Sequence, residues 1–117
     1  MAETKATPGE PPEDGAAALE TLRGEYMELV GQRLPRAAKE GRDWPIRFDH
    51  CFARVILDHL FQGQWYDHID RRKGAAYRQL RADQLERAID LGRQILEGPD
   101  DVLGHMNAQS LRWRGKL

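Results

Sequence analysis

The stretch from Ile46 to Phe61 constrains the fold of this chain more than any other part of the sequence. It is the most apolar run in the chain, and its apolar residues recur at the spacing of one broad helical face. Asp49 or a residue one turn earlier is a suitable N-cap, and Gly63 follows the expected end near Gln62. A helix this apolar must contact neighbours on more than one side. We therefore expect it at the centre of a small core, packed through Phe48, Phe52, Val55, Ile56 and Leu60.

Three further segments show helical periodicity, namely residues 16–33, residues 82–97 and the stretch that follows Pro99. The first should end near Arg33, because Pro35 disfavours the helical conformation at Leu34 and removes a backbone donor. In the second, Gly92 lies on the inward side, where it would let another helix approach closely. Residues 63–80 suggest at most a short helix around Trp65 and a break at Gly74. No segment alternates with the period of a strand, so the sequence predicts an all-α, compact bundle of about four helices.

Residues 1–15 differ in composition from the rest of the chain. They hold several prolines and glycines and no aromatic or branched aliphatic residue, so they cannot bury enough apolar surface to offset the entropy of ordering. We expect a disordered acidic tail at 1–15, followed by a single helical domain at 16–117.

Charge and cysteine content exclude several classes of protein. The net charge of −1 argues against a protein whose entire surface is positive and attracts nucleic acid. The charge is unevenly distributed, with −5 in residues 1–70 and +4 in residues 71–117. Cys51 is the only cysteine, so no intrachain disulfide forms and a reducing compartment fits. No apolar run approaches the length of a membrane span. We expect a cytoplasmic protein without a membrane partner; its oligomeric state stays open.

The central stretch holds the only cysteine and two of the four histidines, which are candidate metal ligands or catalytic groups. His50 and His59 each follow an aspartate, but a separation of nine residues puts them on opposite helical faces, so the sequence predicts neither a metal site nor a catalytic residue. Cys51 in the first helical turn could have an activated thiol. Its apolar neighbours favour a buried, structural cysteine instead.

Two basic stretches are the strongest candidates for a binding surface. The stretch from Arg71 to Arg81 holds five basic residues, no acidic residue and a tyrosine, and a second basic stretch ends the chain. Such clusters neutralise phosphates, and an aromatic ring among them can stack on a base. The alternative is that they only complement helix dipoles or form a solvated connection. The candidate binding residues are Arg71, Arg72, Lys73, Tyr77, Arg78, Arg81, Arg112, Trp113, Arg114 and Lys116.

The sequence Arg71-Arg72-Lys73-Gly74-Ala75-Ala76 also resembles the loop with which acetyl-CoA-dependent N-acetyltransferases hold the cofactor pyrophosphate. The resemblance implies a mixed sheet, with the loop between a strand and the N-terminus of a helix that starts near Tyr77. Asp49-His50-Cys51-Phe52 and residues 110–114 look similar to segments of small uncharacterised bacterial proteins, which imply no function.

These observations predict a non-enzymatic binding or adaptor module that contacts a protein or a nucleic acid through its basic, aromatic-containing surface and needs no cofactor. The alternative is a small enzyme, either acetyltransferase-like or built around His50 and Cys51.

Overall fold

The computed structural model describes residues 11–117, with side chains from residue 15 onward, so most of the predicted tail lies outside the described residues. The predicted all-α fold is confirmed, and the described residues contain no strand. The elements are α1 (Pro11–Glu28), the π-helical turn η1 (Leu29–Arg33), α2 (Leu34–Lys39), α3 (Asp49–Phe61), the 3₁₀ turns η2 (Trp65–Asp67), η3 (Arg71–Lys73) and η4 (Ala76–Gln79), α4 (Ala82–Glu97) and α5 (Asp100–Trp113).

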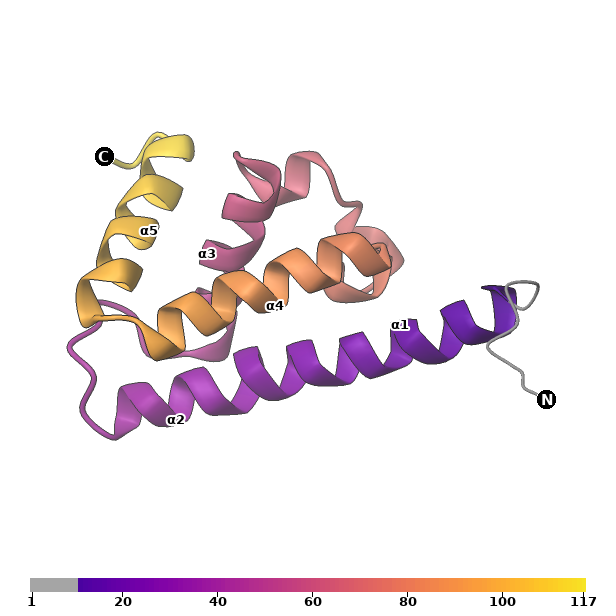
Figure 1. Ribbon diagram of the computed structural model, residues 1–117. Coiled ribbons are helices and arrows are strands. Elements are labelled where there is room, and N and C mark those ends of the chain that lie inside the picture. Colours follow the sequence, from indigo (N-terminus) through magenta and orange to yellow (C-terminus); the bar gives the residue numbers. More distant parts are fainter. Residues whose placement is uncertain (1–10) are drawn as a thin grey trace.

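The first helix is longer than the periodicity predicts. It begins at Pro11, and α1, η1 and α2 form one continuous rod (Figure 1). The prediction that it ends near Arg33 is wrong, because the π-helical turn accommodates Pro35. In this turn the N–H of Leu34 donates to the carbonyl of Leu29, five residues back, and the wider register relieves the clash that proline makes in a regular α-helix.

Helix α3 is central, as its apolar pattern predicts. It packs against α4, α5 and η1, and Figure 1 shows α4 running alongside the long rod. The side chains of Phe52, Val55 and Ile56 are fully buried. The expectation that Phe48 packs into the core is wrong. Its side chain is 63% exposed, because Phe48 precedes α3 in extended conformation.

Gly92 lies on the inward side of α4, as predicted. A Cβ atom at this position would come within 2.6 Å of Leu29 Cδ2 and 3.4 Å of Ile56 Cδ1. The absence of a side chain therefore lets α4 approach both η1 and α3 closely.

The junction between α4 and α5 is closed by Arg42. This side chain donates hydrogen bonds to the carbonyls of Leu96 at 2.8 Å and Gly98 at 2.7 Å, and it pairs with Asp100 in the first turn of α5. Its guanidinium also lies over the ring of Trp44. One cation thus satisfies carbonyls left free at the end of α4 and an acid at the start of α5.

Residues 63–81 contain three short 3₁₀ turns rather than a helix. Helix α3 ends at Phe61, and its C-cap Gln62 has a left-handed conformation with φ of 54°. The N–H of Gly63 donates to the carbonyl of Asp58. Gly74 also has positive φ, at 115°, which agrees with the predicted break. Helix α4 begins only at Ala82, so residues 76–79 are a separate turn.

Candidate functional site

An open groove of about 300 Å³ lies between the long rod, α3 and the segment of 3₁₀ turns. Its walls are mainly apolar and aromatic, and a half-exposed Met27 stands at its edge. This volume is at the lower end of the range for ligand pockets. The residues that line it are Tyr26, Met27, Val30, Gly31, Asp49, His50, Ala53, Arg54, Leu57, Trp65, Ala75, Ala76 and Tyr77.

The rod supplies one wall through the end of α1 and the π-helical turn. Tyr26, Met27, Val30 and Gly31 all lie there. A Cβ atom at Gly31 would meet nothing within 4 Å, so the missing side chain leaves space that belongs to the groove. π-Helical turns are frequent at functional sites because they change which groups a helix presents.

Tyr26 is the aromatic residue of this wall, and 3% of its surface is exposed. Its ring stacks on Tyr77 at a centroid distance of 5.8 Å. Burial raises the pKa of the Tyr26 phenol well above its ordinary value, because the phenolate would be poorly solvated. Tyr26 therefore stays neutral and can both donate and accept a hydrogen bond.

The start of α3 supplies the second wall. Asp49 and His50 line it, with His50 Nδ1 at 3.5 Å from Asp49 Oδ1. The imidazole stacks on the exposed ring of Phe48 at 5.8 Å, so an apolar surface continues from the groove onto Phe48. Cys51 is half-buried and does not line the groove. The groove thus does not join His50 and Cys51 into one centre.

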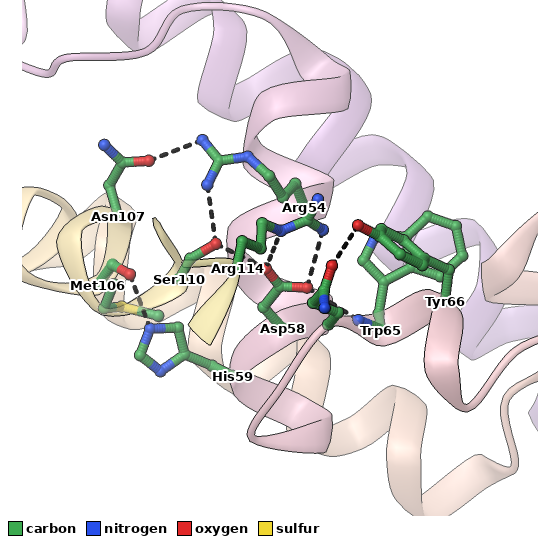
Figure 2. Close-up of polar contacts among 10 residues, drawn as sticks. Arg54, Asp58, His59, Trp65, Tyr66, Met106, Asn107, Ser110 and Arg114 are labelled. Carbon is green, nitrogen blue, oxygen red and sulfur yellow. Dashed lines mark hydrogen bonds and ion pairs between the residues drawn. The ribbon is translucent and has the colours of Figure 1, made fainter. Parts of the chain in front are cut away.

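The third wall comes from Trp65 and residues 75–77, and a buried carboxylate holds Trp65 in place (Figure 2). Asp58 on α3 is fully buried, and its Oδ1 accepts a hydrogen bond from the backbone N–H of Trp65 at 3.0 Å. An acid in the core therefore positions an aromatic residue of the groove.

The same carboxylate ties the end of the chain to α3. Arg114 donates to Asp58 through Nε at 2.7 Å and through Nη2 at 3.1 Å, and Ser110 Oγ donates at 2.7 Å. This hydrogen bonding raises the pKa of the Arg114 guanidinium. With every approach to the carboxylate occupied, the buried charge is both paired and hydrogen-bonded, as burial requires.

Arg54 extends this network and also lines the groove. Its two terminal nitrogens donate to Ser110 Oγ at 2.8 Å and to Asn107 Oδ1 at 2.7 Å (Figure 2). Desolvation, and then the charge of Arg114, lower the pKa of this guanidinium. Arg54 lies four residues before Asp58 on α3, but its hydrogen bonds are to α5, because Arg114 pairs with Asp58.

The two predicted basic stretches meet at Tyr66. The guanidinium carbon of Arg71 lies 4.7 Å from the centre of the Tyr66 ring, and that of Arg114 lies 5.0 Å from it. A polar hollow of about 480 Å³ is lined by residues 66–72. Sequence reasoning could not establish this meeting, because it depends on how α5 packs on α3.

Several of the predicted basic residues have acidic partners within the chain. Arg72 pairs with Asp70 at 3.0 Å and Arg81 with Asp83 at 3.0 Å, and these hydrogen bonds lower the pKa of both carboxyl groups. Arg114 is committed to Asp58. Among the described residues, Arg71, Lys73 and Arg78 have no carboxylate within ion-pair distance. Three of the four basic residues in 71–78 are therefore not paired with a carboxylate of the described residues.

This segment connects the basic stretch to the groove. Arg78 lies over the ring of Tyr77 at 5.3 Å, and Tyr77 lines the groove. By contrast, Trp113 packs edge-on against His59 at 4.9 Å, and Arg112 bonds to Gln109. Lys116 is exposed near the end of the chain. Tyr77 is thus the predicted binding residue that the structure places in the groove.

The groove itself was missed from the sequence. The periodicity of Tyr26 and Val30 indicates only a buried helical face, and the short helix expected around Trp65 does not indicate a groove wall. The one sequence feature that points to the groove wall is Pro35 inside a helical pattern, because a proline predicts irregular backbone one turn earlier in a helix.

The fold implied by the N-acetyltransferase resemblance is not found in the described residues, which contain no strand. Residues 71–76 do not form the start of a helix, since η3, Gly74 and η4 follow one another before α4 begins. The backbone donors expected to face a pyrophosphate are partly used, because Lys73 N donates to the carbonyl of Asp70 and Gly74 N to that of Arg71.

Comparisons with protein-family models, with curated proteins and with solved structures found no match. No helix among residues 11–117 is long and apolar enough to cross a membrane, and these residues contain no group of three or more potential metal ligands.

Proposed function

We propose that this protein is a non-enzymatic adaptor that binds a segment of a partner protein in the groove between η1, α3 and residues 75–77. The observation that carries this proposal is the groove's aromatic and apolar lining at an open surface. Tyrosine and tryptophan are enriched at the centres of protein interfaces, where a few anchors supply most of the binding energy. Tyr77, Trp65 and Met27 offer such anchors around a preformed depression.

The charge beside the groove favours an acidic partner segment. Lys73 and Arg78 flank the groove-lining residues 75–77 and have no carboxylate partner among the described residues. Complementary charge on the partner would speed association and set its orientation more than it would add affinity. In this proposal Lys73, Tyr77 and Arg78 are the part of the predicted basic, aromatic-containing surface that serves the groove.

A peptide-display selection on the native protein tests the proposal. The key variant is Gly31→Leu, because a Cβ atom there meets nothing within 4 Å and the larger side chain should occupy the groove. Gly24→Leu is its matched control, because Gly24 is also helical with open space around it and does not line the groove. Both variants gain about 1 kcal/mol of helix propensity, so neither should unfold the protein.

Selected peptides should bind the wild type and Gly24→Leu equally and lose at least about tenfold in affinity on Gly31→Leu, which corresponds to about 1.4 kcal/mol. Peptides that bind Gly31→Leu as well as the wild type would refute the groove as the site.

Short single- and double-stranded oligonucleotides form a second arm of the experiment. Salt-dependent binding that is lost in Lys73→Gln and Arg78→Gln, and unaffected by Gly31→Leu, would replace the proposal with nucleic-acid binding by residues 71–78.

A further inference from the structure

Two polar groups of groove-lining residues are without a hydrogen-bond partner among the described residues, and both belong to the wall formed by the rod. The first is the hydroxyl of Tyr26, which has no hydrogen-bond partner among the described residues although the side chain is only 3% exposed. Within the same residues, the fully enclosed side-chain nitrogens and oxygens without a partner are Arg23 Nε and Trp44 Nε1. The Tyr26 hydroxyl is not one of these, and Tyr26 itself lines the groove.

The second group is a main-chain carbonyl released by Pro35. Proline has no N–H, so the carbonyl that would receive it is left without a main-chain donor. In an α-helical register that carbonyl belongs to Gly31, and in the π-helical register of this turn it belongs to Val30. The N–H of Leu34 already donates to Leu29. Val30 and Gly31 both line the groove, so in either register the free acceptor belongs to its wall.

An unpaired polar group at a buried site is costly unless a ligand or water satisfies it. Here a free carbonyl can only accept, and a neutral phenol can accept as well as donate. The third wall of the same groove is aromatic, with Tyr77 and Trp65. This combination suits a flat aromatic group that carries a hydrogen-bond donor on its edge.

We infer that the partner segment inserts a tryptophan side chain into the groove and that its indole N–H is accepted by the Tyr26 hydroxyl or the carbonyl freed by Pro35. Indole is a donor with no acceptor, and its ring buries a large apolar area at low conformational cost. The inference rests on the proposed function, since it specifies the anchor of the same partner segment.

The peptides selected on the native protein provide the first test. Those that are sensitive to Gly31→Leu should be enriched in tryptophan among acidic residues. Groove-dependent peptides anchored by leucine or phenylalanine would overturn the inference and leave the proposed function standing. Peptides insensitive to Gly31→Leu would overturn both.

A double-mutant cycle provides the second test. A selected peptide is compared with a version in which 1-naphthylalanine, which has a similar shape and no N–H, replaces tryptophan. On the native protein the tryptophan peptide should bind about two- to tenfold more tightly, as expected for one hydrogen bond. In Tyr26→Phe that advantage should shrink, and it should vanish where the hydroxyl is the main acceptor.

Two further measurements identify the acceptor and the source of the ligand. Pro35→Ala restores a main-chain N–H that can donate to the free carbonyl. If the tryptophan peptide keeps its tighter binding on Tyr26→Phe and loses it on Pro35→Ala, the indole hydrogen bond is to this carbonyl. No advantage on any of these proteins overturns the inference. N-acetyl-tryptophanamide that binds as tightly as the peptide overturns it too, because the site would then take a small molecule rather than a partner segment.

Discussion

Asp58 and Arg114 are 56 residues apart in the chain, yet Arg114 Nε lies 2.7 Å from Asp58 Oδ2. The carboxylate is fully buried and the arginine side chain is 13% exposed. This pair holds the end of α5 against α3, and through the N–H of Trp65 it also fixes one wall of the groove. Its removal should therefore affect stability and binding together.

Replacing Asp58 with alanine should lower the free energy of unfolding by about 3 to 5 kcal/mol, because it leaves the Arg114 guanidinium without its buried partner. Urea denaturation measures this loss. The control is Asp67→Ala, which removes an exposed carboxylate from the neighbouring turn and should change stability by about 0.5 kcal/mol at most. A loss below about 1 kcal/mol for Asp58→Ala would show that the pair contributes little.

Gly92→Ala should destabilise the protein even though alanine favours helix. The new methyl group would lie 2.6 Å from Leu29 Cδ2, and both residues are buried in the contact between α4 and η1. Overpacking costs about 1 to 3 kcal/mol, whereas helix propensity returns about 1 kcal/mol at most. Thermal denaturation should show a lower melting temperature.

Gly104→Ala on α5 is the matched control for that variant, because a Cβ atom there meets nothing within 4 Å. It should raise the melting temperature through helix propensity alone. Equal stabilisation by both substitutions would mean that Leu29 moves aside freely.

The burial of Tyr26 predicts a loss of stability in alkali. Its pKa in the folded protein is raised above the ordinary value of 10.0, so above that pH the unfolded chain releases a proton that the folded protein retains. The free energy of unfolding then falls as pH rises, by up to about 1.4 kcal/mol per pH unit for this one group. Below pH 10 the group should have no effect.

The substitution Tyr26→Phe removes the pH-dependent contribution of this phenol to the free energy of unfolding. Denaturant titrations of both proteins between about pH 8 and pH 11 should show a difference that grows in favour of the variant above about pH 10. At neutral pH the variant should equal or slightly exceed the wild type, because the lost hydroxyl has no partner among the described residues. Parallel curves over the whole range would contradict this account.

The helical class, the central position of α3 and the inward Gly92 were all determined by sequence alone. Each depends on the spacing of apolar residues within one helix, and that spacing is a local property. The restart of the chain after Gly98 is likewise local, because proline and acids suit a helix N-terminus.

Tertiary structure decided where the helix around Pro35 ends and which residues share a site. Arg33 and Leu34 stay helical because the core holds the buried side chains of Leu29, Val30 and Leu34 in one rod, and packing of this kind overrides a local preference. Likewise, the basic residues were visible in the sequence, but their partners were not. Arg114 forms an ion pair with Asp58, and Arg72 forms one with Asp70. Tyr26, Trp65 and Tyr77 line one groove. Such pairings join residues far apart in the chain, and only the packing of the helices brings them together.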